Sequence, residues 1–265
     1  MVVGLAQMHI EWENKEDNLI KLEEYLRDFS RDKVCDNGII LFPEMSLTGF
    51  SMNTDVTADR QRETVDICKK LAAQYNISMG IGWVSKENEL AKNHYSIIAA
   101  SGVEILDYVK IHPFAYSGED KYFEGGNAIY TCKMGDFNVG VLICFDLRFP
   151  EVFQHLSDEA EFIIVPANWP MARSGHWNTL LSARAIENQC YIAGVNCVGE
   201  IGGQMYGGDS ALISPEGVRI TPVRTCEYAD GGSLLIYNID NNVKKIRDNF
   251  PVKSARRTDL YRTLM

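Results

Sequence analysis

Residues 137–151 read FNVGVLICFDLRFPE, an apolar run that changes abruptly to polar residues. The run predicts a buried strand that ends at Cys144. Pro150 and Glu151 predict the start of a helix, because proline suits the first helical turn and a carboxylate suits its positive end. A strand, a turn and a helix in this order project the turn side chain and aim backbone N–H groups at one point. Cys144 is therefore either a reactive thiol or an inert buried cysteine.

Apolar runs and amphipathic segments alternate along the rest of the chain, which predicts a layered α/β fold in a single domain, 1–265. Several runs are apolar at every position, as expected for strands covered on both faces. Helices are predicted at 15–29 and 60–75, from near Ser174 and from Pro150. The predicted strands are 2–8, 38–42, 77–84, 96–100, 137–144, 161–167, 190–196, 210–214 and 233–239, and 96–100 pairs with 104–110 like a hairpin.

Composition excludes several classes of protein. The 265 residues are 46% hydrophobic and 23% charged, which is ordinary for a globular chain. The net charge is −10 without any basic block, so we expect no nucleic-acid partner and no anionic membrane surface. No apolar stretch approaches the ~20 residues of a membrane helix, and the N-terminus lacks the basic start of a secretory signal.

Cysteine usage points to a reducing compartment. The seven cysteines, an odd number, include no C-x-x-C pair, and histidine is scarce. A disulfide framework or a zinc site is therefore not expected, and a cytoplasmic location is. The cysteines are Cys35, Cys68, Cys132, Cys144, Cys190, Cys197 and Cys226.

Two further apolar runs end on ionisable residues. In IILFPEMSLTGF (39–50), Glu44 follows the strand as either a buried base or a surface residue that starts a loop. In YVKIHPF (108–114), Lys110 ends a strand, and alone it would be read as a solvated lysine. His112 is better explained as a structural hydrogen-bonding residue than as a catalytic base.

Together, in this chain order, the three motifs resemble those of the nitrilase (carbon–nitrogen hydrolase) superfamily. FPEMSLTGF matches its glutamate motif, YVKIHPF its lysine motif and LICFDLRFPE its cysteine motif. A further family glutamate falls on Glu119 in SGEDKYFEGGN. The resemblance continues through PANWP (166–170), SARAIENQ (182–189) and GGDSALISPEG (207–217). It implies a four-layer α-β-β-α sandwich that pairs face to face as a homodimer.

The resemblance also implies roles in amide hydrolysis. Cys144 would attack the carbonyl carbon to form a thioester, and Glu44 would move the protons. Lys110 and the backbone N–H of Phe145 would stabilise the oxyanion. Glu119 would position Lys110 or the substrate. No metal and no organic cofactor are expected.

Within the superfamily, ANWPMARSGHWNTLLSARAIENQCYIAGVN (167–196) and DNFPVKSARRTDLY (248–261) look like the omega-amidase branch, which acts on small 2-oxo acid amides such as 2-oxoglutaramate. The far carboxylate of such a substrate needs a cation. Arg173 is the first candidate, with a solvated loop arginine as the alternative. Arg148 is the second, although pairing with Asp146 or Glu151 is the favoured interpretation.

The remaining pocket candidates lie in two loops. Asn168 and Trp169 either line the pocket or serve as a turn residue and a core aromatic. In loop 112–124, Phe114 and Tyr116 could line the pocket, and Pro113 replaces the leucine that the family often has. This departure weakens the transfer of the omega-amidase substrate to this chain.

The sequence leaves other functions open. A nitrilase or an N-carbamoyl amidohydrolase would use the same three residues. A binding or adaptor protein could keep the fold without turnover. A redox-sensing thiol is a more distant alternative.

Overall fold

The computed structural model describes residues 1–31 and 38–264, and within them the strands form two larger sheets and one hairpin. The first sheet has the order β13 (Arg224–Glu227), β14 (Ser233–Asn238), β1 (Val2–Gln7), β2 (Ile39–Leu41), β3 (Ser78–Ser85), β4 (Lys92–Ile98) and β5 (Glu104–Val109). The second has the order β12 (Ala211–Ile213), β9 (Tyr191–Asn196), β8 (Phe162–Ala167), β7 (Phe137–Val141) and β6 (Thr131–Met134). The hairpin joins β10 (Val198–Ile201) to β11 (Gln204–Gly207).

The centre of each sheet is parallel. Strands β1, β2 and β3 run parallel to one another, and so do β7, β8 and β9, whereas the flanking strands pair antiparallel. Strands β8 and β9 are buried along their whole length. This burial matches the apolar runs without alternation that the sequence shows, because central strands of a layered fold are covered on both faces.

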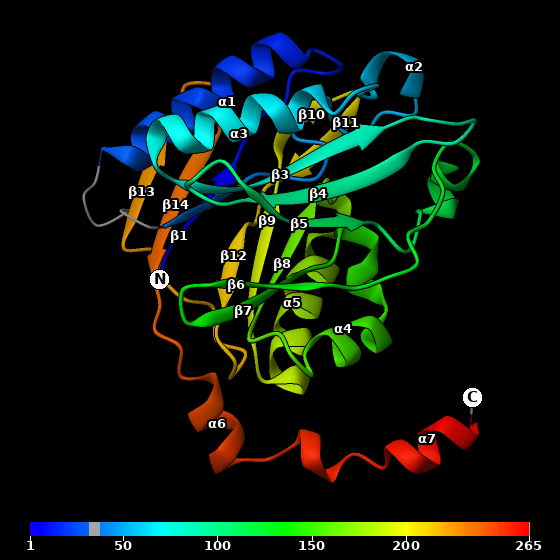
Figure 1. Cartoon of the computed structure of the whole chain (residues 1–265), viewed down its shortest axis with the longest axis vertical. Helices are drawn as coiled ribbons and strands as arrows, with labels where there is room; N and C mark the ends of the chain where they lie inside the picture. The colour runs from blue at the N-terminus through cyan, green and yellow to red at the C-terminus, as the bar shows by residue number, and fades with distance from the viewer. Residues whose placement is uncertain (32–37, 265) are drawn as a thin grey trace.

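Helices cover the outer face of each sheet, so the molecule has four layers (Figure 1). Helices α1 (Lys15–Ser30) and α3 (Glu63–Tyr75) pack on the first sheet, and α4 (Pro150–Leu156) and α5 (Ser174–Asn188) on the second. The apolar stripe of α1, with Leu22, Leu26 and Phe29, is fully buried. Burying one such side chain stabilises the fold by roughly 1.5–3 kcal/mol. The predicted α-β-β-α sandwich is confirmed.

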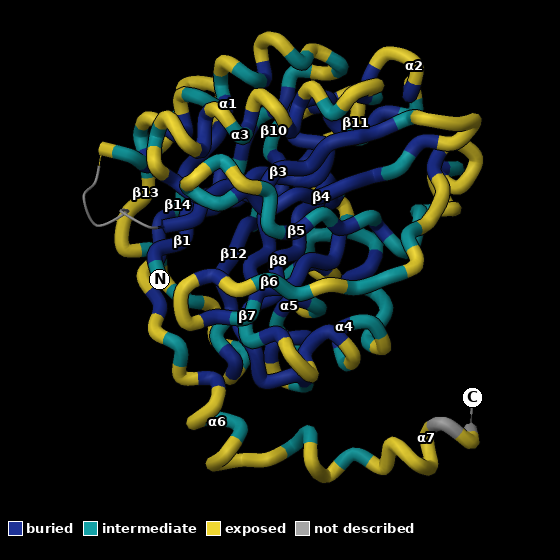
Figure 2. The backbone as a smooth tube through the Cα atoms, viewed as in Figure 1, coloured by how far each residue is buried: buried dark blue, intermediate teal, exposed yellow. Residues whose placement is uncertain are grey.

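Alternation along the strands divides the core in two. On β1, Val3 and Leu5 belong to the cluster shared with the second sheet and α5, and Ala6 belongs to the cluster under α1 and α3. On β2, Leu41 belongs to the cluster shared with the second sheet, and Ile40 belongs to the cluster under α1 and α3. Figure 2 shows the sheets as the buried centre of the molecule.

Several predicted boundaries differ from the structure. Strand 137–144 ends at Val141, because Cys144 adopts a left-handed backbone with φ 46°. Helix 60–75 begins at Glu63, because Arg62 before it is also left-handed, with φ 64°. Strand 96–100 is instead Lys92–Ile98. Strands β6, β10, β11 and β13 were not predicted.

The C-terminal segment forms an arm that passes the C-terminal ends of α4 and α5 (Figures 1 and 2), where Arg247 donates to the Gln189 carbonyl at 3.1 Å and Lys253 pairs with Asp158 at 2.8 Å. It carries α6 (Val243–Asn249) and α7 (Thr258–Leu264), and its residues are mostly exposed. The short helix α2 (Thr54–Thr57) lies near the opposite end of the molecule. Within the described residues, no helix is long and apolar enough to cross a bilayer. The six cysteines in the described part are free, and Cys35 lies outside it.

Candidate active site

Glu44 lies at the end of β2, fully buried, where both of its carboxylate oxygens accept hydrogen bonds. Oε1 accepts from Lys110 Nζ at 2.9 Å and from Asn93 Nδ2 at 2.8 Å. Oε2 accepts from the backbone N–H of Asn168 at 2.9 Å. Burial alone would raise the pKa of Glu44, but the charge of Lys110 and these hydrogen bonds outweigh burial and lower it. Glu44 is therefore a carboxylate at neutral pH.

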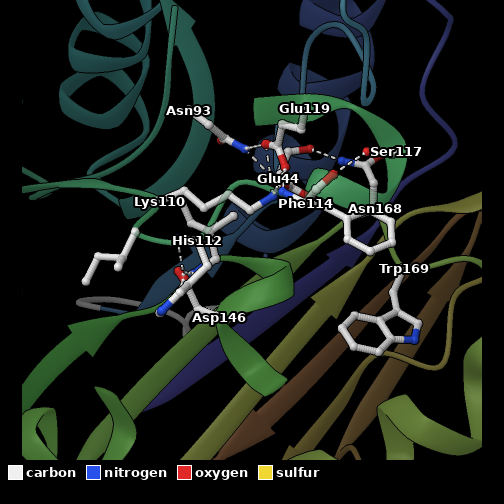
Figure 3. A network of polar contacts seen from close by, with 12 residues as sticks. Glu44, Asn93, Lys110, His112, Phe114, Ser117, Glu119, Asp146, Asn168 and Trp169 are labelled. Carbon is white, nitrogen blue, oxygen red and sulfur yellow. Dashed lines mark hydrogen bonds and ion pairs between the residues drawn. The ribbon is translucent and has the colours of Figure 1, made fainter. Parts of the chain in front are cut away.

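Lys110 follows β5 and lies between two carboxylates (Figure 3). Its Nζ donates to Glu44 Oε1 and also to both oxygens of Glu119, at 3.0 and 2.9 Å. Burial opposes the charged form, yet Glu119 and Glu44 together raise the pKa of Lys110 above its ordinary value. Only 1% of Lys110 is exposed. The ammonium is therefore a fixed charge inside the protein.

Glu119 comes from η3 (Glu119–Lys121), a short 3₁₀ turn in the loop after β5. Besides Lys110, it accepts from Asn93 Nδ2 at 3.3 Å and from the backbone N–H of Phe114. Burial, and then the charge of Glu44, raise the pKa of Glu119, although Lys110 opposes this. The two carboxyl groups thus differ, because the pKa of Glu44 is lowered and the pKa of Glu119 is raised.

Cys144 opens η4 (Cys144–Arg148), three residues after the end of β7 at Val141. Buried Asp146 holds this turn by accepting hydrogen bonds from the Ile143 N–H at 2.9 Å and the Tyr108 hydroxyl at 2.8 Å. Asp146 also contacts His112 Nδ1 at 2.7 Å, so His112 has the structural role that its sequence context favours. This contact ties the cysteine turn to the segment that carries Lys110.

The thiol of Cys144 is half-buried and reaches a cavity of about 200 Å³. Burial, and then the negative charge of Glu44, raise the pKa of Cys144 well above that of a free thiol, although Lys110 opposes this. The resting cysteine therefore keeps its proton. A proton on sulfur beside an ionised carboxylate is the starting arrangement for base-assisted attack.

The cavity collects most of the residues that the sequence predicted. Its wall includes Lys110, Cys144, Phe145, Asn168, Trp169 and Arg173. Glu44 and Glu119 are fully buried and lie behind this wall, in contact with Lys110. Asn168 also donates from Nδ2 to the Glu44 carbonyl at 2.6 Å. Figure 3 shows the buried acids grouped around the end of the lysine side chain.

The prediction that Tyr116 lines the pocket is wrong. Tyr116 is 87% exposed and is not part of the cavity wall. The reason is the turn η2 (Ala115–Ser117), since residues three apart share one side of a 3₁₀ helix. Phe114 and Ser117 are three apart and both line the cavity, whereas Tyr116 lies on another side.

The favoured interpretation of Arg148 is also corrected. Arg148 does not pair with Asp146 or Glu151 among the ion pairs of the described residues. Its guanidinium instead lies 4.8 Å from the centre of the Trp169 ring, and it lines the cavity. Arg173 lines the same cavity, 5.5 Å from the Phe114 ring. Burial and then the charge of Arg173 lower the pKa of Arg148.

Several residues of the site were missed from the sequence. Asn93 is a buried amide within β4. The sequence signal that could have indicated it is a polar residue within a strand. The others come from segments far apart in the chain, so no local motif identifies them. They line the cavity and include Trp12, Phe50, Ile201, Gln204 and Tyr206.

Comparison with known proteins shows the family to which the chain belongs. A family model described as carbon-nitrogen hydrolase matches residues 2–248. The 2-oxoglutaramate amidase of Bacillus subtilis (strain 168) is 30% identical over 267 residues, with 98% of each chain covered. The omega-amidase YafV of Escherichia coli (strain K12) is 33% identical over 216 residues, which cover 81% of this chain and 82% of that protein.

A solved structure adds the fold-level match. XC1258 from Xanthomonas campestris is a CN-hydrolase superfamily protein with an arsenic adduct in its active site. It is 25% identical, covers 97% of each chain and superposes with a TM-score of 0.85. The resemblance seen in the three motifs is confirmed, and the chain belongs to the carbon–nitrogen hydrolase family.

Proposed function

We propose that this enzyme hydrolyses the terminal amide of a small carboxylate-bearing amide, of the 2-oxoglutaramate class, through a thioester on Cys144. One observation carries the proposal. A cavity of about 200 Å³ joins a thiol, backed by the buried Lys110–Glu44 ion pair, to the arginines Arg148 and Arg173. The chain is an amide-hydrolysing member of its family, and its relatives include proteins named 2-oxoglutaramate amidase and omega-amidase.

Acylation starts from the neutral thiol and the ionised carboxylate. As the sulfur of Cys144 attacks the amide carbon, Glu44 takes the thiol proton and passes it to the departing nitrogen, which leaves as ammonia. The lowered pKa of Glu44 and the raised pKa of Cys144 keep the proton on sulfur until attack. Glu44 then removes a proton from the water that cleaves the thioester.

The oxyanion that develops at each step faces the fixed charge of Lys110. A buried ammonium stabilises such a charge strongly, because no solvent has to reorient. The N–H of Phe145, the first backbone donor after Cys144, supplies the second contact. Glu119 holds Lys110 through two hydrogen bonds and so acts as a positioning residue.

Arg173 and Arg148 supply the cation that the far carboxylate of the substrate needs. Both guanidiniums line the cavity, and within the described residues neither forms a salt bridge with a carboxylate of the protein. Two such groups close together repel each other, so an anionic ligand relieves an unfavourable arrangement. The substrate carboxylate is the group that fits this charge.

Ammonia release from a substrate panel tests the proposal. The panel holds 2-oxoglutaramate, glutamine, an uncharged short amide, a nitrile and an N-carbamoyl amino acid, with Cys144→Ala as the blank. We expect 2-oxoglutaramate to give the highest kcat/KM. A preference for the nitrile or the carbamoyl compound would replace the amidase assignment by one of these activities on the same residues. Absence of turnover on the whole panel would favour a binding protein.

We further propose that residues 1–265 act as one catalytic domain, in a cytoplasmic homodimer. Glu44 and Lys110 follow strands of the first sheet and Cys144 a strand of the second, so neither sheet carries the site alone. The homodimer is carried over from the resemblance to the superfamily, and the mostly exposed C-terminal arm is the segment that we expect to contact the second copy. Light scattering at micromolar concentration tests the dimer, and the mass of a single chain would contradict it.

A further inference from the structure

Trp12 stands at the open end of the cavity. The residues at the reacting end are closed off, since Lys110 is 1% exposed and Glu44 fully buried. Trp12 lines the same cavity but is 41% exposed. A substrate whose amide reaches Cys144 therefore directs its far end toward the region that Trp12 borders.

The backbone on both sides of Trp12 is fixed. Before it, the buried side chain of Asn18 accepts from the Glu11 N–H at 2.7 Å and donates to the Glu11 carbonyl at 2.7 Å. The same amide donates to the Leu47 carbonyl at 2.8 Å, which ties this loop to the segment after Glu44. An amide that makes all of these contacts while buried holds the loop in one position.

After Trp12, Glu13 adds a second anchor. Its backbone N–H donates to the Thr48 carbonyl at 3.0 Å. Its carboxylate accepts from the Ser51 hydroxyl at 2.5 Å and from Asn53 Nδ2 at 3.1 Å. The indole is thus carried by a rigid loop rather than by a freely moving one.

Two glycines leave the space that the indole fills. A Cβ on Gly202, in the turn between β10 and β11, would lie 2.6 Å from the Cε3 and Cζ3 atoms of Trp12. A Cβ on Gly49 would lie 3.2 Å from the Trp12 Cε3 atom. Gly203, next to Gly202 and also at positive φ, has no atom within 4 Å of its Cβ position. The indole therefore packs against a fitted surface.

From this arrangement we infer that Trp12 sets the length of the acyl chain that the enzyme accepts. The inference rests on the proposed function, since it assigns the far end of the substrate to the mouth of the cavity. A fixed indole in the wall of the cavity that Arg173 also lines leaves room for a short chain and excludes one with additional methylene groups. Trp12 is a specificity-determining residue that takes no part in the chemistry.

The test measures kcat/KM for two series of amides. One series is the monoamides of unbranched dicarboxylic acids from four to seven carbons, and the other is the uncharged aliphatic amides of matching length. The variants are Trp12→Ala, Trp12→Phe and the pair Gly202→Ala and Gly203→Ala. The glycine pair is matched: both changes add a methyl group at positive φ, but only Gly202→Ala displaces the indole.

We expect the wild type to lose activity beyond one chain length, by about tenfold per methylene. Trp12→Ala removes this loss through a lower KM for the long amides, and Trp12→Phe lies between. Gly202→Ala changes the chain length at which the loss begins, because it displaces the indole, whereas Gly203→Ala keeps the wild-type profile. Identical length profiles in wild type, Trp12→Ala and Gly202→Ala overturn the inference. If the wild type takes only uncharged amides, the proposed function fails, while the uncharged series still decides the role of Trp12. No turnover of any amide by the wild type overturns both.

Discussion

Replacing Glu119 by glutamine tests whether this residue positions Lys110. All of its partners are donors: Lys110 contacts both oxygens, Asn93 Nδ2 contacts Oε1, and the Phe114 N–H contacts Oε2. A glutamine amide offers only one oxygen, so its NH₂ group must face a donor in either orientation. The change therefore removes a charge-assisted hydrogen bond and leaves buried donors without an acceptor.

The size of the effect follows from these contacts. A hydrogen bond to a charged group contributes about 1.5–3 kcal/mol, and about 1.4 kcal/mol corresponds to a tenfold change in rate. If Lys110 loses its fixed position, we expect kcat to fall by about 10- to 150-fold. KM should change little, because Glu119 is fully buried and is not part of the cavity wall.

Steady-state ammonia release at several substrate concentrations separates kcat from KM. The matched control is Glu124→Gln in the same loop, which removes the same charge from an exposed pair with Lys92 at 3.3 Å. Thermal melting of both variants reports whether they remain folded. A folded Glu119→Gln enzyme with the kcat of the wild type would refute the positioning role.

Three further outcomes follow from the site. Arg173→Met should raise KM for 2-oxoglutaramate by about 10- to 100-fold, since it removes a cation for the far carboxylate. The KM for an uncharged amide should stay unchanged. Equal effects on both substrates would contradict this. Asn93→Ala removes a donor to the Glu44 carboxylate. Without this hydrogen bond the charged form of Glu44 is less stabilised, so its pKa rises. The acidic limb of the pH profile of kcat/KM should therefore move up by roughly one pH unit, and an unmoved or lowered limb would contradict this. Tyr116→Ala should keep kcat/KM within about twofold, because the ring is exposed.

The layers of the fold could be predicted because apolar patterns are local. Strand β8 reads FIIVPA and is buried at every position, and the stripe of α1 recurs with helical spacing. The first half of β4 was missed because it carries polar residues such as Asn93 and His94. His94 Nδ1 contacts Asp107 at 2.9 Å on the next strand, and a partner of this kind cannot be read from one segment.

The candidate site likewise has residues that local motifs predict and residues that only the packing of distant segments brings together. Glu44, Lys110 and Cys144 each end an apolar run, so the motifs predict them as candidates without a structure. Trp12 and Tyr206 reach the cavity from opposite ends of the sequence, and only the packing of the hairpin β10–β11 against the N-terminal segment brings them together. Tyr116 was misassigned because proximity in sequence to Phe114 does not give the direction of a side chain.

The central claim is that the sulfur of Cys144 carries the acyl group. Its most direct test is kcat/KM of Cys144→Ala on the amide that the wild type hydrolyses best. Cys132→Ala, another half-buried free cysteine, but one outside the cavity wall, is the matched control. We predict a loss of about 10³-fold or more for Cys144→Ala and none for Cys132→Ala. A folded Cys144→Ala enzyme that keeps wild-type activity would contradict the account.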